Sequence, residues 1–120
     1  MKALTALLFV LFAVLPAHAD SPSGQELNRM MQASEGRHAD SGDFQAGTYE
    51  GYILGVSDGL VGTSLYYYCP PVKTSKNQLR GVVSQYLKSH PKDLHVPAGA
   101  LVAAALIEAF PCKKKSQDQD

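Results

Sequence analysis

The sequence predicts an all-α fold, a small bundle of about four helices with one intramolecular disulfide. Three observations predict this fold class. Apolar residues recur at helical spacing in several segments, two segments begin with a capping pattern, and no segment reads as a convincing strand. The chain has 120 residues, and what remains after a signal segment is enough for one small domain with a single core.

The first segment reads as a secretory signal. A lysine precedes an apolar block over residues 3–15, and small residues stand at Ala17 and Ala19, as a signal peptidase requires. The apolar block is shorter than the roughly 20 residues that cross a bilayer. We therefore expect cleavage after Ala19. The expected divisions are a signal peptide over residues 1–19, a helical domain over 20–112 and a polar tail over 113–120.

The charges of the chain cancel, because 11 basic and 11 acidic side chains leave no formal net charge. Three lysines at residues 113–115 form the only basic cluster in the sequence. Nucleic acids and membrane surfaces attract proteins through extended basic patches. We therefore expect no nucleic-acid partner, and no membrane contact after signal cleavage.

The first helix is expected over residues 24–34. Ser23 can cap this helix, and Glu26 can reach back to complete a capping box. Gly36 suits the end of the helix. Residues 36–43 then read as a loop, because small and polar residues dominate them.

The second helix is expected over residues 43–66, with Asp43 as its cap, and it carries a glycine at every fourth position. A glycine inside a helix costs roughly 1 kcal/mol against alanine. These glycines form one stripe along the helix, and we expect this stripe to let the alanine-rich last helix approach closely. A phosphate-binding loop is the rival interpretation, but the GxGxxG spacing and a preceding strand are missing. The stripe is Gly47, Gly51, Gly55 and Gly59, and the expected core face is Phe44, Tyr52, Ile53, Val56 and Leu60.

Two further helices complete the bundle. A break at two prolines precedes a helix over residues 76–89, for which Ser75 and Gln78 offer a second capping box. Pro97 suits the first turn of a last helix over residues 98–110. The apolar residues at core spacing are Leu79, Val82, Val83, Tyr86 and Leu87 in one helix, and Leu101, Val102, Ala105, Leu106, Ala109 and Phe110 in the other.

The two cysteines, Cys69 and Cys112, lie in the exported part of the chain, where an oxidising compartment allows disulfides to persist. Closing the loop between them is worth roughly 4 kcal/mol on the chain-entropy model. A redox or metal role is the alternative, but there is no CxxC motif and no histidine at ligand spacing. We expect a structural disulfide.

No convincing catalytic constellation is present. Ser57 and Asp58 have no histidine near them in sequence, and the motif around them is not a nucleophile elbow. His90, Asp93 and His95 could be imagined as a metal site, but they lack helical spacing and further ligands. Solvated loop histidines, including His38, are the favoured interpretation. We expect no enzymatic activity, no cofactor and no metal.

The order of these features resembles the Rap/Tai family of type VI secretion amidase immunity proteins. The likeness runs from about residue 44 to residue 112, through a glycine-tyrosine helix, a Cys-Pro pair, a Gln-Leu helix, a proline loop and an alanine-leucine helix ending in Pro-Cys. The residues that carry it are Gly51, Tyr52, Gly55, Asp58, Cys69, Pro70, Gln78, Leu79, Val82, Tyr86, Leu87, Pro91, Ala105, Leu106, Phe110, Pro111 and Cys112.

The resemblance implies a small helical protein of the periplasm, often a homodimer, that binds a peptidoglycan-cleaving amidase and covers its active-site cleft. Several members of the family carry another cysteine just before the glycine-tyrosine pair. Thr48, Tyr49 and Glu50 stand there in this chain, so a second disulfide of that type is absent.

Two segments are candidates for contact with such a partner. Three tyrosines precede the first cysteine, and tyrosine is enriched at interfaces, although core packing around the disulfide explains them equally well. The polar connection over residues 88–95 is the second candidate, with a plain connector as its alternative. The candidate contact residues are Tyr66, Tyr67, Tyr68, Lys88, His90, Lys92, Asp93 and His95.

Two other classes of function stay open at this point. A periplasmic stress chaperone of the HdeA type is also small, helical and stabilised by one disulfide, but few histidines and modest acidity give no evident acid switch. A structural envelope protein without a toxin partner is the third hypothesis.

Overall fold

A computed structural model describes residues 20–36, 42–63 and 67–113 of the chain. These residues form four α-helices and one short 3-10 helix, with no strand among them beyond an isolated bridge between Ser23 and Pro97. The prediction of an all-α bundle is confirmed. The elements are α1 (Gly24–Glu35), α2 (Gly42–Thr63), α3 (Lys76–Ser89), η1 (Pro91–Asp93) and α4 (Ala98–Ala109).

The caps of α1 and α3 follow directly from local sequence. The Glu26 backbone N–H donates to the Ser23 hydroxyl oxygen at 3.2 Å, and the Ser23 N–H donates to the Glu26 carboxylate at 2.8 Å. Ser75 and Gln78 repeat this exchange at the start of α3, at 3.2 and 2.7 Å. Both predicted capping boxes are confirmed.

Some helix ends differ from the prediction. The α2 helix begins at Gly42, so Asp43 lies in its first turn and not at its cap. Pro97 is the residue that precedes α4 and not part of its first turn. The expected signal peptide, Tyr66 at the expected end of the second helix, and residues 114–120 of the tail all lie outside the described residues.

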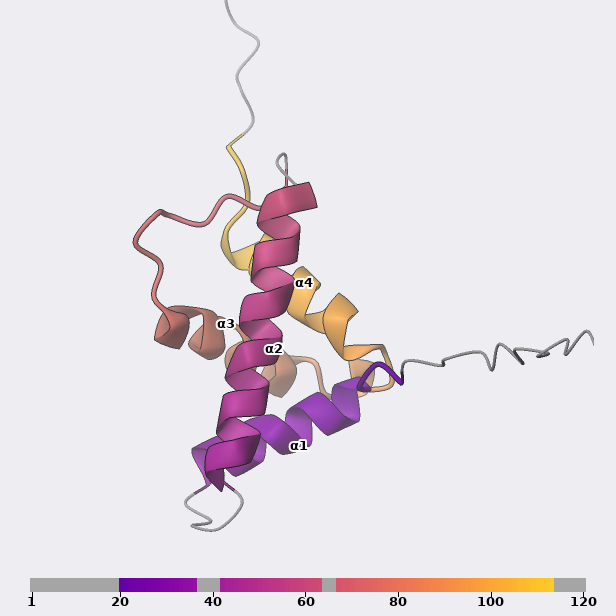
Figure 1. The fold of residues 1–120 in the computed structure, drawn as a ribbon. Coiled ribbons are helices and arrows are strands. Elements are labelled where there is room, and N and C mark those ends of the chain that lie inside the picture. The colour runs from indigo at the N-terminus through magenta and orange to yellow at the C-terminus, as the bar shows by residue number, and fades with distance from the viewer. Residues whose placement is uncertain (1–19, 37–41, 64–66, 114–120) are drawn as a thin grey trace, which may run out of the picture.

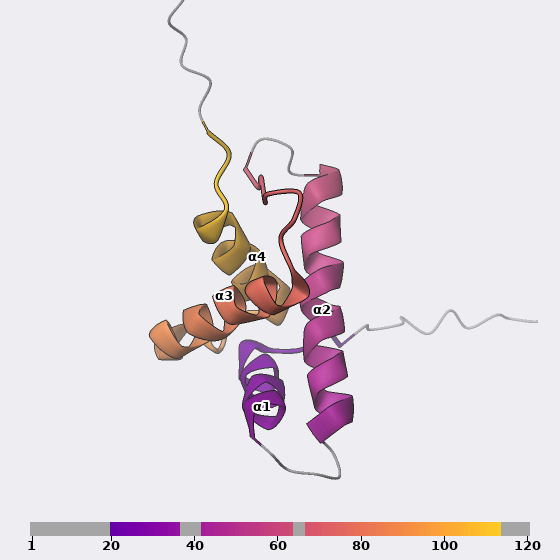
Figure 2. The same ribbon diagram turned by 90° about the vertical axis from the view of Figure 1, so that its left-hand side faces the viewer.

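The α2 helix is the longest element, and α1, α3 and α4 all pack on one side of it (Figure 1 and Figure 2). The core lies where the four helices meet, which leaves the opposite side of α2 open. The buried apolar side chains of the core are Leu27, Met31, Tyr49, Ile53, Tyr68, Leu79, Val83, Leu87, Ala98, Leu101, Val102, Ala105 and Leu106.

The prediction that the glycine stripe packs against α4 is wrong. Gly47, Gly51, Gly55 and Gly59 are exposed, and a Cβ atom added at any of them would meet no described atom within 4 Å outside the adjoining residues and backbone of α2 itself.

The side of α2 that faces the bundle carries larger side chains. Tyr49, Ile53 and Ser57 form a row that starts two residues after Gly47, which at 3.6 residues per turn is about 200° around the helix. Burying tyrosine and isoleucine removes far more apolar surface from water than burying glycine. The helix therefore turns its glycines outward, and Phe44, which was also expected in the core, is 76% exposed.

The starts of α1 and α4 are joined by backbone hydrogen bonds. The Gly24 N–H donates to the Val96 carbonyl oxygen at 2.8 Å, and the Ala98 N–H donates to the Pro22 carbonyl oxygen at 2.9 Å. Gly24 is buried at this junction. An added Cβ would lie 2.7 Å from the Leu94 carbonyl oxygen, so glycine is required here for close approach.

The predicted disulfide between Cys69 and Cys112 is confirmed, with a Cα–Cα distance of 4.9 Å. The Cys69 N–H also donates to the Phe110 carbonyl oxygen at 2.9 Å. Beside them the Tyr68 ring lies edge-on to the Phe110 ring, and the Tyr68 and Ser57 hydroxyl groups are 2.7 Å apart. These contacts hold the segment after α2 against the end of α4.

Candidate partner-binding surface

The groups that the sequence offered for a metal site or a nucleophile are separated or engaged in the described residues. No three of their His, Cys, Asp or Glu side chains lie close enough together to hold a metal ion. Ser57 is 6% exposed, and its hydroxyl group is engaged with Tyr68. His38 lies outside the described residues. None of the helices described is both long and apolar enough to cross a bilayer.

The three tyrosines before Cys69 do not share one environment. Tyr68 is 3% exposed and belongs to the core, so the prediction that it contacts a partner is wrong. The physical reason is its position beside the disulfide, where its ring fills space between α2 and α4. Tyr67 is 67% exposed, and its role in partner contact stays a prediction. Tyr66 lies outside the described residues.

Sequence reasoning missed an exposed apolar residue in the segment that follows Cys69. Val72 is fully exposed, at a turn that the Thr74 N–H closes by donating to the Pro71 carbonyl oxygen at 2.9 Å. The two adjacent prolines were the available signal, because they hold the backbone extended and away from the core. Tyr67 and Val72 thus display apolar surface from a backbone that the disulfide anchors.

The connection between α3 and α4 is held by several hydrogen bonds. The Lys88 ammonium group lies 2.9 Å from the Glu35 carboxylate, which links the end of α3 to α1. The Val96 N–H donates to the Asp93 carbonyl oxygen at 2.9 Å. His95 Nδ1 lies 3.0 Å from the Lys92 carbonyl oxygen. The candidate residues of this connection therefore sit on an ordered scaffold, which lowers the entropy cost of binding a partner.

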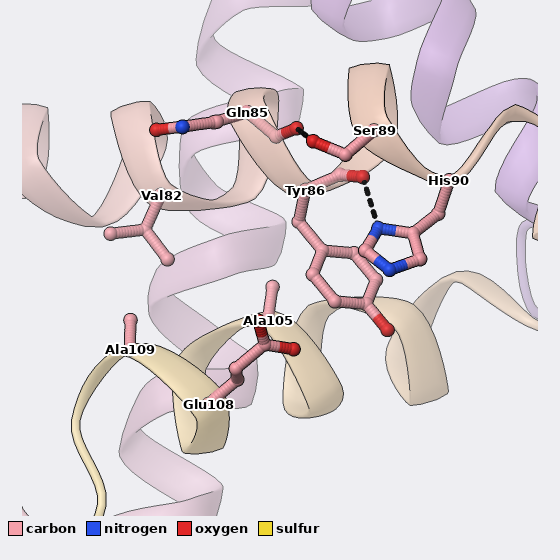
Figure 3. A pocket seen from close by; sticks show the side chains of 8 residues that line it. All are labelled: Val82, Gln85, Tyr86, Ser89, His90, Ala105, Glu108 and Ala109. Atoms are coloured by element: carbon pink, nitrogen blue, oxygen red, sulfur yellow. Dashed lines mark hydrogen bonds between the residues drawn. The ribbon is translucent and has the colours of Figure 1, made fainter.

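A groove of about 260 Å³ lies between α3 and α4 (Figure 3). It forms because α4 presents alanines where larger side chains would fill the space against α3. Of the predicted candidates only His90 lies in it. The residues that line the groove are Val82, Gln85, Tyr86, Ser89, His90, Ala105, Glu108 and Ala109.

The wall of the groove on α3 is an aromatic pair. The Tyr86 and His90 rings are stacked, with centroids 3.9 Å apart and planes inclined by 18°. His90 Nδ1 lies 2.8 Å from the Tyr86 carbonyl oxygen (Figure 3). A carbonyl oxygen can only accept, so His90 Nδ1 carries a proton and donates it in this hydrogen bond.

One charge network joins α2 to α3 elsewhere on the surface. The Glu50 carboxylate lies 2.9 Å from Lys76 Nζ and 3.6 Å from an Arg80 guanidinium nitrogen. The hydrogen bond from Lys76 is the main reason that the pKa of Glu50 is lowered, and the charges of both basic side chains add to it. This network stabilises the acidic side chain in its ionised form.

A comparison with protein-family models finds that the model of the Rap1a immunity proteins matches residues 23–112. The matched part runs from the cap of α1 to the second cysteine, so it includes all four described α-helices and the disulfide. A search among curated proteins finds no match to the chain.

Proposed function

Since the chain belongs to the Rap1a immunity protein family, we propose that it is a periplasmic protein that binds and blocks a peptidoglycan amidase delivered by a type VI secretion system. Family membership points to immunity against a secreted effector. The family match over nearly the whole described bundle is the observation that carries the proposal. The choice of an amidase rests in addition on the ordered sequence likeness to the Rap/Tai proteins.

The mechanism that we propose is occlusion by stoichiometric binding. Such an inhibitor needs no catalytic group of its own, only a rigid body that presents side chains in place for the partner. The disulfide, the capping boxes and the ordered connection after α3 supply that rigidity. Tyr67 and Val72 beside the disulfide, and Lys92 in the connection after α3, are exposed on this framework, and we assign all three to contact with the amidase.

The location that we propose is the periplasm, with the signal peptide removed after Ala19. Two observations support it. The first residues have the pattern of a secretory signal. The Cys69–Cys112 bond is of the kind that persists in oxidising compartments such as the bacterial periplasm.

A homodimer is the remaining part of the proposal. It rests on the resemblance to Rap/Tai proteins, which are often dimeric. Phe44 and Val61, near the two ends of α2, are 76% and 48% exposed, which leaves apolar surface for such an association. Sedimentation over a range of concentrations measures the mass, and a monomer at every concentration would contradict this part alone.

The decisive experiment pairs binding with inhibition. The protein, purified from the periplasm of cells that express the full sequence, is titrated calorimetrically against amidases encoded beside its gene. The same mixtures are then assayed for peptidoglycan cleavage. We expect tight binding to one amidase and loss of its activity at a fixed stoichiometry. If none binds, or if a bound amidase keeps its activity, the proposed function is wrong.

A further inference from the structure

We propose that the groove between α3 and α4 is a subsite that takes an arginine side chain of the partner protein. The identity of the partner rests on the proposed function, whereas the chemistry of the groove does not depend on it. The groove lies beside the connection over residues 88–95, and His90 belongs to both. A partner that covers this connection is therefore in reach of the groove.

The size of the groove fits a single side chain. Its volume of about 260 Å³ is below the roughly 300–1,000 Å³ of typical small-molecule sites. Val82, Ala105 and Ala109 give it an apolar lining, against which the methylene groups of a long basic side chain can pack.

The aromatic wall favours a planar cation. Tyr86 and His90 are stacked on each other, and the hydrogen bond from His90 Nδ1 to the Tyr86 carbonyl oxygen holds the imidazole in place. A guanidinium group stacks on aromatic rings and is attracted by their electron-rich faces. A lysine ammonium group shares the charge but not the planar shape, so the wall favours arginine.

The groove carries an acidic side chain. Among the residues that the structure describes, Glu108 is the one Asp, Glu, Lys or Arg that lines it, and no ion pair engages its carboxylate. Figure 3 shows the Glu108 side chain directed from α4 toward the Tyr86 ring.

The other polar groups of the groove add acceptors. The Ser89 hydroxyl group donates to the Gln85 carbonyl oxygen at 2.7 Å, so its lone pairs remain available. A carboxylate ligand would face repulsion here, whereas a guanidinium group would gain charge-assisted hydrogen bonds.

The first test uses a small probe and needs no amidase. The isotope-labelled protein is titrated with N-acetyl-L-arginine amide and followed by amide chemical shifts. N-acetyl-L-norleucine amide, whose apolar side chain is two atoms shorter, serves as the uncharged probe. We expect weak, saturable shifts around Tyr86, His90 and Ala105 with the arginine probe only.

Two exposed carboxylates provide matched variants for this titration. Glu108→Gln removes the charge in the groove, and Asp58→Asn removes a charge on α2, outside the groove lining. We expect Glu108→Gln to lower the affinity for the arginine probe by about threefold to fivefold, as for an exposed ion pair. We expect Asp58→Asn to leave this affinity unchanged. Absence of saturable shifts, equal shifts with norleucine amide, or insensitivity to Glu108→Gln would each overturn the inference.

The second test separates this inference from the proposed function. With an amidase that binds the wild-type protein, Glu108→Gln should weaken binding by about tenfold, and Asp58→Asn should not. Equal binding of wild type and Glu108→Gln would overturn the arginine subsite and leave the proposed function standing. If no amidase binds, the proposed function fails, and the probe titration alone decides the groove.

Discussion

Alanine substitutions at two glycines should change stability in opposite directions. At Gly24 the new Cβ would lie 2.7 Å from the Leu94 carbonyl oxygen and 3.0 Å from its carbonyl carbon. This backbone cannot retreat freely, because Val96 accepts a hydrogen bond from the Gly24 N–H at 2.8 Å. Overpacking of this kind costs about 1–3 kcal/mol.

At Gly55 the surroundings are open. Outside the adjoining residues and backbone of α2 itself, no described atom lies within 4 Å of an added Cβ, and the position is in the interior of the helix. Alanine is therefore a better helix residue without a steric penalty, and the free energy of unfolding should rise by about 0.5–1 kcal/mol. For a domain of this size, 1 kcal/mol corresponds to about 4–8 °C in Tm. We expect Gly55→Ala to raise Tm by about 2–8 °C, and Gly24→Ala to lower it by about 4–24 °C.

The assay is urea and thermal unfolding followed by far-ultraviolet circular dichroism, with the disulfide intact. Equal dependence of the unfolding free energy on urea in all three proteins is the control that the same transition is compared. A Gly24→Ala protein as stable as wild type would refute the close approach of α1 to Leu94. A destabilised Gly55→Ala protein would show that the open side of α2 is covered in solution. If that loss grew with protein concentration, a second copy would be the cover.

Three further outcomes are expected. Cys112→Ser should lower the free energy of unfolding by about 2–5 kcal/mol, and thermal melts unchanged by this variant or by reductant would show that the bond does not constrain the fold. Because the pKa of Glu50 is lowered in the folded state, its stabilising effect is complete above the usual carboxyl pKa of about 4.3 and is lost as the pH falls through the lowered value. Glu50→Gln should therefore be less stable than wild type near neutral pH, with the difference vanishing in acid, and a constant difference across an acid series of unfolding curves would contradict this reasoning. Val72→Asp and Lys92→Glu should weaken amidase binding in calorimetry while changing stability by no more than about 0.5 kcal/mol, and unchanged affinity in both would remove these residues from the proposed surface.

The features that could be predicted from the sequence depend on short stretches of chain, or on two cysteines that can form one intramolecular pair. Ser23 with Glu26 and Ser75 with Gln78 place the starts of two helices within a few residues, because a capping box needs only its own first turn. The disulfide followed from the presence of two cysteines after a predicted export signal. The helical pattern of α3 was readable because polar residues clearly separate its apolar positions.

The orientation of α2 and the groove were decided by tertiary structure. Tyr49 and Gly47 lie on opposite sides of a helix that has apolar residues on every side, so no local pattern selects the inner face. Contact with three other helices selects it, since the side with large side chains buries more apolar surface. Glu108 and His90 are 18 residues apart and meet at one groove only because α3 and α4 pack together. Local sequence determines where helices begin, whereas the choice of buried face and the sites between helices depend on packing between distant segments.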